Sequence, residues 1–354
     1  MKKILMVTSE FKVSGPNNVI LNLINSLLKN SQYVIKLTSL RKCSEQTSSK
    51  YLNKINLNKD DIIKCNNSLS LLHLFKLIKK HSPDVINTHG FRADIFVFLL
   101  SFIFKYKHVA TVHNIPNEDY VMRYGKFTGQ VMLYAHMFVF RSNRVLKIAV
   151  SNNAKKNLIL LGAKNVDYIY NGIDKQNFDI NGKSKPLQEN CNRRKKVIYC
   201  GHLSKIKDPL TLARTAPINK DIDIIFLGSG ELQEAIEKFK SENIILAGRV
   251  ENVASYLSNA DLFVMPSISE GMPMALIEAM FAGLPIICSD IPIFKEVLSL
   301  GNANIDLFKV GDYLDLAKKI KESVNHSGEA NILLAEHYFS STAMADKYQE
   351  AFSG

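Results

Sequence analysis

The sequence predicts an α/β protein of two doubly wound domains with parallel sheets, and three observations support this fold class. Short apolar runs such as Lys3–Ser9 and Val197–Gly201 alternate with segments of helical periodicity along the whole chain. A length of 354 residues suits two domains. A polar stretch at residues 175–195 separates the two alternating series and is expected to be a linker.

The net charge divides the chain into two unlike halves. Residues 1–189 hold 28 Lys and Arg against 12 Asp and Glu, whereas residues 190–354 hold 17 against 21. A basic half suits an anionic partner. Because no stretch carries a nucleic-acid motif or basic residues interleaved with stacking aromatics, we expect an anionic membrane surface and no nucleic acid.

Composition also bounds the cellular location. The longest apolar run, Ile95–Phe104, is shorter than the roughly 18–20 residues that a membrane span needs. The start, MKKILMVTSEF, has an apolar part too short for a signal peptide and is expected to be a first buried strand. The five cysteines show neither pairing spacing nor a Cys-x-x-Cys, which indicates a reduced cytosol and no structural zinc.

The first strand leads to a turn at Gly15 and a helix with an apolar stripe. A single glycine between strand and helix can cradle phosphate, although most such turns are only turns. Tyr33–Ser39 is a second strand, and residues 40–68 are expected to be a polar excursion with little core. The stripe of the first helix is formed by Ile20, Leu23, Ile24 and Leu27.

Two helical segments of the basic half could contact lipid. Leu71–Lys80 carries an apolar face opposite Lys76 and Lys80, which favours an ordinary surface helix over one that touches lipid. A long helical stretch from Tyr120 to Arg144 mixes methionines and aromatic residues with arginines. Core packing is the default for such a stripe, and a surface for lipid or a lipid-linked acceptor is the alternative.

Two strands of the first half end in histidines. The strand from Asp84 leads to His89, and the strand from His108 leads to His113. Ligands of open α/β sheets bind just past the carboxyl ends of strands, so both positions are candidates. A lone histidine is nevertheless more often structural.

The second half repeats the alternation of strands and helices. Its first strand is followed by a loop with His202 and Lys207, and a later strand by Arg249. A lysine in such a loop is more often solvated than functional. Asp221-x-Asp223 has the form of a metal-binding pair, but it leads straight into a strand and is interpreted as structural.

The residues of the segment Ser267–Ser289 indicate one particular class of ligand. After a buried strand comes a polar loop with Glu270 and Gly271, and a helix predicted to begin at Pro273. The amino end of a helix favours phosphate, while carboxylates such as Glu270 and Glu278 accept hydrogen bonds from hydroxyl groups. A nucleotide sugar satisfies both, although an isolated Glu-x7-Glu spacing arises easily by chance.

The loop Ser-x-Ser-Glu-Gly-Met-Pro and the helix ALIEAMFAG resemble the signature segment of the retaining glycosyltransferases of family 4. TVHN, YNGID and the G-x-L…K loop resemble further elements of that family, in the same order. His202 stands where the family has arginine, and Pro16 replaces the second glycine of its first loop.

The resemblance implies the GT-B architecture, in which two Rossmann-like domains face each other across a deep cleft and a C-terminal helix returns to the first domain. The corresponding ranges are an acceptor domain at 1–170, a linker at 171–195, a nucleotide-sugar domain at 196–338 and the returning helix at 339–354. It further implies catalytic roles for Glu270 and His113. The implied donor-binding residues are Glu278, Lys207, His202, Gly271, Met272, Pro273, Met274, Arg249 and Gly15.

The expected activity is retaining transfer of a hexose or N-acetylhexosamine from a UDP-linked sugar to a lipid-linked glycan, in surface polysaccharide assembly. Neither a metal nor another cofactor is expected, because Lys207 and a helix terminus can stabilise the departing diphosphate. The expected location is the cytoplasm, peripheral on the inner face of the cell membrane. The alternatives are a non-catalytic nucleotide-sugar-binding module and another GT-B sugar-nucleotide enzyme.

Overall fold

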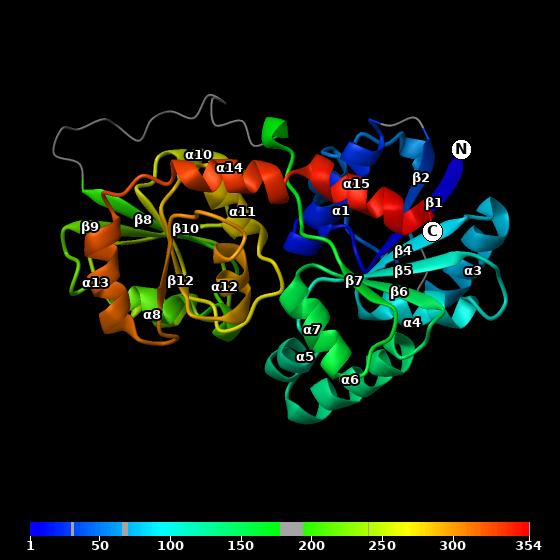
Figure 1. The fold of residues 1–354 in the computed structure, drawn as a ribbon, viewed down its shortest axis with the longest axis horizontal. Helices are drawn as coiled ribbons and strands as arrows, with labels where there is room; N and C mark the ends of the chain where they lie inside the picture. The colour runs from blue at the N-terminus through cyan, green and yellow to red at the C-terminus, as the bar shows by residue number, and fades with distance from the viewer. Residues whose placement is uncertain (30–31, 66–69, 178–193, 240, 354) are drawn as a thin grey trace. The chain divides into compact units, whose positions relative to one another are not determined.

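The computed structural model describes residues 1–29, 32–65, 70–177, 194–239 and 241–353, which form two compact units. The N-terminal domain comprises Met1–Asp174 and Ser341–Gly354, and the C-terminal domain comprises Lys175–Ser340. Each domain is an α/β layer structure around one parallel sheet (Figure 1). The predicted fold class, with two Rossmann-like domains, is therefore confirmed.

The sheet of the N-terminal domain has the strand order β3-β2-β1-β4-β5-β6-β7. All of its strand pairings are parallel. Parallel neighbours need long crossover connections, which helices mostly provide here. Its strands are β1 (Lys2–Thr8), β2 (Tyr33–Ser39), β3 (Ile62–Ile63), β4 (Val85–His89), β5 (Lys107–Val112), β6 (Val145–Ala149) and β7 (Val166–Tyr168). Its helices are α1 (Gly15–Leu27), α2 (Glu45–Leu52), α3 (Ser70–His81), α4 (Phe91–Leu100), α5 (Pro116–Tyr124), α6 (Lys126–Phe140), α7 (Asn152–Leu160) and α15 (Ser341–Ser353), with a 3-10 turn η1 (Lys59–Asp61).

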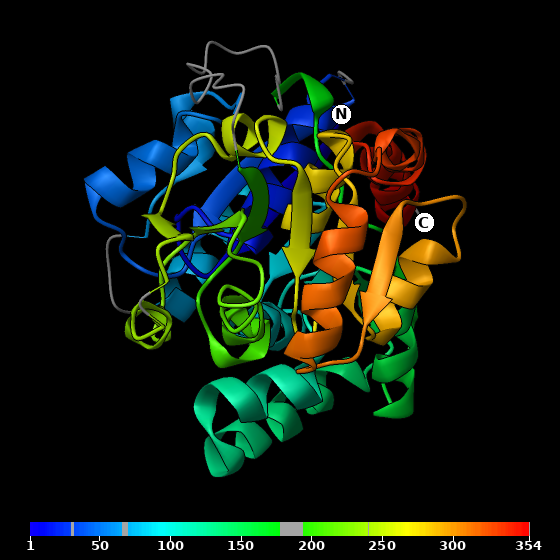
Figure 2. The ribbon, with the colours of Figure 1, turned by 90° about the vertical axis from the view of Figure 1, so that its left-hand side faces the viewer.

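The sheet of the C-terminal domain has the order β10-β9-β8-β11-β12-β13, and Figure 2 shows this domain from its own side. Its strands are β8 (Lys195–Cys200), β9 (Ile222–Leu227), β10 (Ile244–Gly248), β11 (Leu262–Met265), β12 (Ile286–Ser289) and β13 (Ile305–Phe308). Its helices are α8 (Pro209–Ala213), α9 (Gln233–Glu237), α10 (Val253–Ser258), α11 (Met274–Phe281), α12 (Pro292–Leu298), α13 (Tyr313–Ser323) and α14 (Glu329–Tyr338), with 3-10 turns η2 (Lys175–Asn177) and η3 (Lys205–Lys207).

The last helix, α15, belongs to the N-terminal domain, as expected of the returning helix. It packs against α1 and reaches β5, where Tyr348 is buried. The hydroxyl groups of Tyr348 and Thr111 lie 2.8 Å apart, and the Sδ of Met344 accepts a hydrogen bond from the Gly172 N–H. The C-terminal segment therefore completes the core of the first domain.

The helical stretch predicted from Tyr120 to Arg144 is two helices, α5 and α6. Gly125 separates them with φ at 82°, a conformation that glycine adopts without strain. The helices then pack so closely that a Cβ at Gly129 would lie 2.5 Å from the Tyr120 carbonyl oxygen. The prediction of one long helix was wrong because periodicity continues across the break.

The predicted excursion at residues 40–68 contributes more core than expected. It contains α2, η1 and β3, and Tyr51 of α2 is fully buried with its ring stacked on Phe11. Helix α11 begins at Met274 rather than Pro273, which is the extended N-cap residue. Most of the predicted linker, residues 178–193, lies outside the described residues.

Candidate active site

The C-terminal domain places its candidate residues at one edge of the sheet. Strand β8 is the first of this domain; β9 and β10 lie on one side of it, and β11 to β13 lie on the other. The chain order thus reverses between β8 and β11, which is the topological switch point where ligands of open α/β sheets bind. The loops that follow β8 and β11 carry Lys207 and Glu270.

Lys207 and Glu270 meet across this switch point. Lys207 Nζ lies 2.5 Å from Glu270 Oε1, and the Ser267 hydroxyl donates to the same oxygen at 2.8 Å. A backbone bond from the Ile268 N–H to the Ile206 carbonyl oxygen at 2.9 Å joins the two loops and fixes the approach. Glu270 is buried, whereas the Lys207 side chain keeps 28% of its surface exposed. The ammonium group can therefore reach a ligand, while the buried carboxylate is held by its bonds to Lys207 and Ser267.

Helix α11 begins directly after this pair. Gly271, Met272, Pro273 and Met274 are all buried, and Pro273 ends the loop in an extended conformation. The first N–H groups of α11 have no intrahelical partners, which makes this terminus suited to an anion. Glu278 lies in the second turn of α11 and is half-buried. Burial raises the pKa of the Cys200 thiol at the end of β8, and the charge of Glu278 raises it further.

The neighbouring loops are joined into one continuous wall. The Gly228 N–H bonds to the Gly248 carbonyl oxygen at 2.7 Å, and the Leu203 N–H bonds to the Ser229 carbonyl oxygen at 3.1 Å. A Cβ at Gly228 would lie 1.9 Å from the Gly201 carbonyl oxygen, so the close contact of the loops after β8 and β9 requires glycine there. This wall fixes the positions from which side chains project.

His202 and Arg249 project from this wall but do not join the Lys207–Glu270 pair. His202 Nε2 lies 3.5 Å from Glu231 Oε2, and both side chains are 55% exposed. Arg249 is exposed, and its Nε donates to Ser229 Oγ at 3.1 Å. Arg249 follows the edge strand β10, which β9 and β8 separate from β11, the strand that precedes Glu270.

In the N-terminal domain, the two predicted histidines form a pair. His89 is the last residue of β4 and His113 follows the neighbouring strand β5, and His89 Nδ1 lies 2.8 Å from His113 Nε2. His89 Nε2 lies 2.9 Å from Asn87 Oδ1. The Asn87 amide nitrogen donates to the Val109 carbonyl oxygen at 3.0 Å and to Thr111 Oγ1 at 3.1 Å.

Both histidines are held neutral. Burial lowers the pKa of His113 to about 4, against a smaller opposite effect of Asp94, and burial together with His113 lowers the pKa of His89 well below its usual value. Neutral imidazoles can accept as well as donate hydrogen bonds, and they offer no cation to a phosphate. The pair therefore suits hydroxyl groups.

Gly15 occupies the first position of α1 and is exposed. The loop before it is held by Asn17, which is buried and donates to the carbonyl oxygens of Glu10 and Lys12, each at 2.8 Å. The Tyr51 hydroxyl in turn donates to the Asn17 carbonyl oxygen. The hydrogen bonds of Asn17 therefore hold the backbone of the loop that leads to Gly15.

Several residues of these sites were not identified from the sequence. Asn87 precedes His89 by two positions on one strand, so the period of two could have placed them on one face. The contacts of Thr111 and Tyr348 join segments that are 24 and 237 residues apart and carry no local signal. Asn17 and Ser267 bond to residues within seven positions of their own, in loops without a regular period. Within the described ranges, no cluster of three or more His, Cys, Asp or Glu side chains could hold a metal ion.

In comparisons with known proteins, both domains match glycosyltransferase families. Residues 13–177 match the family described as "Glycosyltransferase Family 4", and residues 194–326 match the family described as "Glycosyl transferases group 1". The O-antigen biosynthesis glycosyltransferase WclY of Escherichia coli is 26% identical over an alignment of 377 residues, covering 99% of this chain and 98% of the relative.

Two further similarities concern a galactosyltransferase and a solved fold. The UDP-Gal:alpha-D-GlcNAc-diphosphoundecaprenol alpha-1,3-galactosyltransferase of Escherichia coli is 26% identical, with 63% of this chain and 62% of the relative covered. The crystal structure of Anabaena HepE in complex with UDP superposes with a TM-score of 0.78 at 19% identity, over 100% of both chains. The latter similarity establishes the fold alone.

Proposed function

Because the chain belongs to family 4 of the glycosyltransferases, we propose that it transfers a hexose or N-acetylhexosamine from a UDP-linked sugar to a lipid-linked glycan, with retention of configuration. The observation that carries this proposal is the Lys207–Glu270 pair at the amino end of α11. The names of its relatives, in O-antigen biosynthesis and in transfer to a diphosphoundecaprenol-linked sugar, support surface polysaccharide assembly.

The diphosphate is the group that needs stabilising. As the bond to the sugar breaks, negative charge grows on the leaving phosphate, and only groups that bind this charge more tightly in the transition state accelerate the reaction. Lys207 supplies a full positive charge and α11 supplies free N–H groups. The acceptor hydroxyl attacks the same face of the sugar, and its proton passes to the departing phosphate.

The two glutamates bind hydroxyl groups at either end of the donor. Glu270 Oε1 is occupied by Lys207 and Ser267, and within the described part of the chain no residue bonds to its Oε2, which can accept from a sugar hydroxyl. Glu278, the fifth residue of α11, accepts from the ribose hydroxyls. We also propose that His113 accepts a hydrogen bond from a sugar hydroxyl group, as the resemblance implies.

The direct test is sugar transfer by the purified protein. A panel of nucleotide sugars is first screened by thermal shift, because a donor that binds only the folded state raises the melting temperature. UDP release is then measured with the best donor, with and without a polyprenyl-diphosphate-linked sugar as acceptor. Glu270→Gln should abolish transfer and lower the melting temperature of the free protein by only about 2–4 °C, the shift that corresponds to a loss of about 1 kcal/mol. Near-normal turnover of this variant would refute the assigned role of Glu270.

A non-catalytic binding module is the competing function, and the exposed His202–Glu231 pair favours it. A carboxylate beside His202 opposes the diphosphate that an arginine at this position would attract. The two functions differ in one outcome. A binding module would be stabilised by a nucleotide sugar without releasing UDP from it, whereas the enzyme releases UDP in proportion to acceptor.

Catalysis by Lys207 and a helix terminus requires no metal ion, so we propose a metal-independent reaction. Turnover should persist in excess chelator. Loss of turnover that Mg²⁺ or Mn²⁺ restores would refute this mechanism of charge stabilisation.

We further propose that the N-terminal domain attaches peripherally to the inner face of the cell membrane. Residues of α6 at helical spacing form an apolar stripe that faces solvent, with Phe127 at 84%, Tyr134 at 69% and Phe138 at 71% exposure. Phe102 and Ile103, just after α4, extend this surface at 62% and 66%. Exposed cations border it, namely Arg123, Lys126, Arg141 and Arg144.

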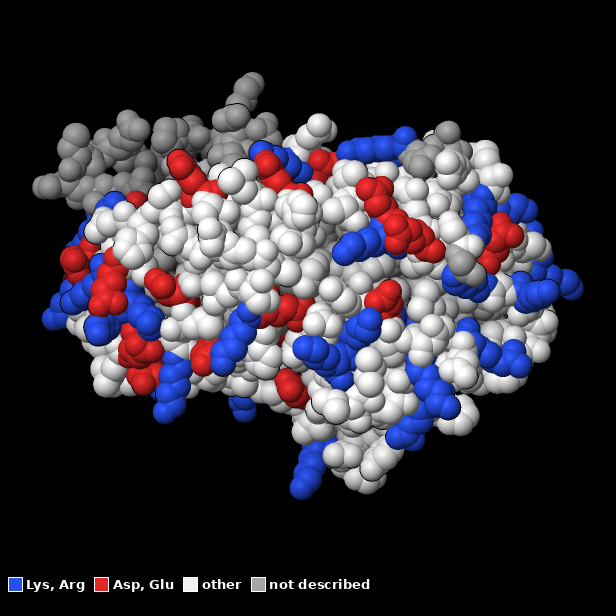
Figure 3. All heavy atoms as spheres, in the orientation of Figure 1, with Lys and Arg blue, Asp and Glu red and all other residues white. Residues whose placement is uncertain are grey.

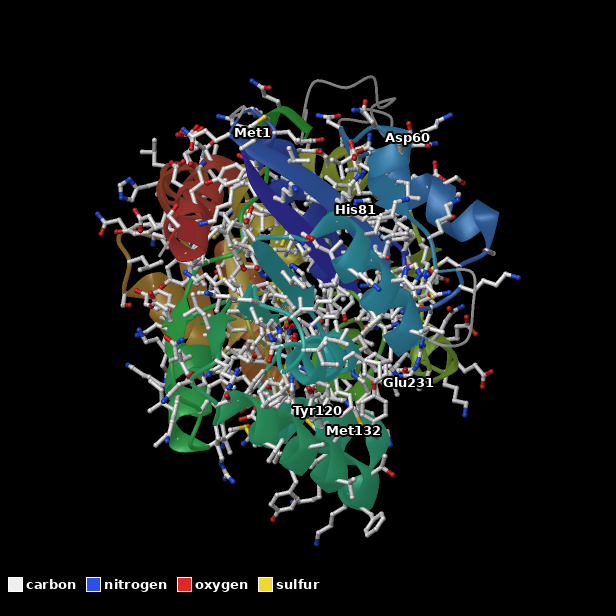
Figure 4. The ribbon with its side chains drawn as sticks, turned by 90° about the vertical axis from the view of Figure 1, so that its right-hand side faces the viewer. Met1, Asp60, His81, Tyr120, Met132 and Glu231 are labelled. Atoms are coloured by element: carbon white, nitrogen blue, oxygen red, sulfur yellow. The ribbon has the colours of Figure 1, made fainter. Side chains whose placement is uncertain are left out.

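The charge distribution agrees with this orientation. In Figure 3, the lobe formed by α5 and α6 is largely uncharged with blue side chains at its rim, and Lys and Arg dominate the visible face of the N-terminal domain. Figure 4 labels Tyr120 of α5 and Met132 of α6 in this lobe. In helix α3, Leu74 and Ile78 of the apolar stripe are buried in the core and are not available to lipid. No helix of the described residues is long and apolar enough to span a bilayer.

Sedimentation with liposomes tests the attachment. Binding should require anionic lipid and fall steeply with salt, since each basic residue near such a surface contributes about 1 kcal/mol and is screened. Replacing Phe127, Tyr134 and Phe138 by serine should abolish it. The matched control replaces Leu314 and Leu333 of the C-terminal domain, which are 60% and 72% exposed. Equal recovery with neutral vesicles, or equal loss in the control, would refute the proposal.

A further inference from the structure

One chain of hydrogen bonds connects the C-terminal helix with the candidate sugar-binding histidine. It runs from Tyr348 of α15 to Thr111 of β5, then to Asn87 and His89 of β4, and ends at His113. Its first four members are buried, and all five belong to the N-terminal domain. Each bond spans 2.8 to 3.1 Å, within the normal range for hydrogen bonds.

The direction of the hydrogen bonds in the histidine part of this chain follows from one backbone carbonyl group. The Val109 oxygen can only accept, so the group of Asn87 that faces it must be the amide nitrogen. The Asn87 oxygen therefore faces His89 and can only accept from it. This requires the hydrogen of neutral His89 on Nε2 and a lone pair on Nδ1.

The same logic passes to His113. Because His89 Nδ1 carries a lone pair, the bond between the rings must be donated by His113 Nε2. Burial keeps the pKa of His113 low, so the ring has no second hydrogen at neutral pH. His113 Nδ1 must then be an acceptor, and it has no hydrogen-bond partner among the described residues.

We propose that Asn87, acting through His89, is a positioning residue that fixes His113 in the tautomer with an accepting Nδ1, and that Thr111 and Tyr348 hold Asn87 in the orientation required. The ligand group facing His113 is consequently a hydrogen-bond donor, a sugar hydroxyl rather than a phosphate oxygen. The identity of that ligand rests on the proposed function, whereas the tautomer does not.

The energetic consequence is one of preorganisation. An imidazole free to exchange its hydrogen between nitrogens presents the wrong atom to a hydroxyl for part of the time and must reorient on binding. A fixed acceptor is ready for the ligand. The C-terminal helix thus supports the site in addition to completing the core.

The decisive experiment observes the tautomer directly. Nitrogen chemical shifts of the histidine rings distinguish Nε2–H from Nδ1–H in the ligand-free protein at pH 7, with signals assigned through the variants His89→Gln and His113→Gln. We expect Nε2–H for both rings. Nδ1–H at His113 would overturn the proposal, whatever the protein transfers, so this result is separate from failure of the proposed function.

Substitution of Asn87 provides the second readout. Asn87→Leu removes the acceptor for His89 and should give a mixture of tautomers at His113. Asn87→Asp keeps an acceptor there but adds a charge that stabilises an imidazolium, so the acid limb of kcat/KM should move upward by about one pH unit or more. The other charges that act on the pair are the two rings themselves and the Asp94 carboxylate. An acid limb that stays in place would overturn the assigned role of Asn87.

The part of the hydrogen-bond chain that is furthest from His113, formed by Thr111 and Tyr348, is tested with matched controls. Thr111→Val and Tyr348→Phe should each lower kcat about 3- to 10-fold with little change in donor KM, as expected for one neutral hydrogen bond. Thr38→Val and Tyr106→Phe are comparable losses in the same domain, because those hydroxyls donate to the carbonyl oxygens of Ile63 and Val97. These controls should change kcat less than twofold. Equal effects in test and control variants would show that α15 only stabilises the fold and would overturn this part of the proposal.

Discussion

Replacing Lys207 by methionine should destabilise the free protein more than replacing Glu270 by glutamine. The Glu270 side chain is 6% exposed, whereas that of Lys207 is 28% exposed. Loss of the cation leaves a buried carboxylate that, among the described residues, keeps only the Ser267 hydroxyl as a partner, which is costly. Loss of the carboxylate charge leaves an ammonium group that water still reaches.

The geometry sets the size of the effect. Two unit charges 2.5 Å apart attract by about 7 kcal/mol at an effective dielectric constant near 20, and desolvation of both groups offsets most of this. Breaking a fully buried pair costs about 3–5 kcal/mol. Because Lys207 is partly in water, we expect about 2–3 kcal/mol for Lys207→Met and about 1 kcal/mol for Glu270→Gln.

Urea unfolding of the two variants and their combination measures these values. The double variant should lose less than the sum, since either single change already breaks the pair. Lys205→Met is the matched control, because Lys205 occupies the same 3-10 turn and is exposed. Turnover should fall about 100- to 1,000-fold for Lys207→Met, and less than twofold for the control. A strictly additive double variant, or wild-type stability of Lys207→Met, would refute the reasoning.

The remaining predictions concern donor binding and pH. Glu278→Ala should weaken UDP binding by about 1–3 kcal/mol in calorimetry, since a charged acceptor is lost, and an unchanged Kd would contradict the ribose contact. His202→Arg should tighten UDP binding, because arginine carries a permanent charge and can donate to phosphate in a bidentate way; no change would place His202 outside the donor site. Stability should decline as pH falls from about 6.5 to 4, because the unfolded chain then binds protons that the buried histidines of the folded chain do not bind. A urea midpoint equal at pH 7.5 and pH 5 would contradict the burial of these rings, which are His89, His108 and His113.

Hydrophobic patterns in the sequence were sufficient to predict the order of strands and helices. Tyr33–Ser39 was predicted to the residue, and the first strand within one residue at each end, because buried parallel strands appear as short apolar runs bounded by polar turns. The pattern failed where tertiary packing overrode it. Gly125 breaks a helix whose periodicity continues on both sides, and Tyr51 is buried although it lies in a polar stretch.

The sequence pointed to individual candidate residues but not to their arrangement. Glu270, Gly271 and Glu278 lie close in sequence, so a strand, a loop and a helix terminus sufficed to suggest a nucleotide sugar. The histidines at the strand ends were visible for the same reason. Neither observation shows which side chains touch.

Only the tertiary structure decided the contacts between distant segments. Lys207 and Glu270 are 63 residues apart and meet because β8 and β11 are neighbours in the sheet. Thr111 and Tyr348 are 237 residues apart and meet because the last helix packs on the first domain. Local periodicity records whether a residue is inside or outside, whereas strand order and the return of the chain result from the packing of the whole domain.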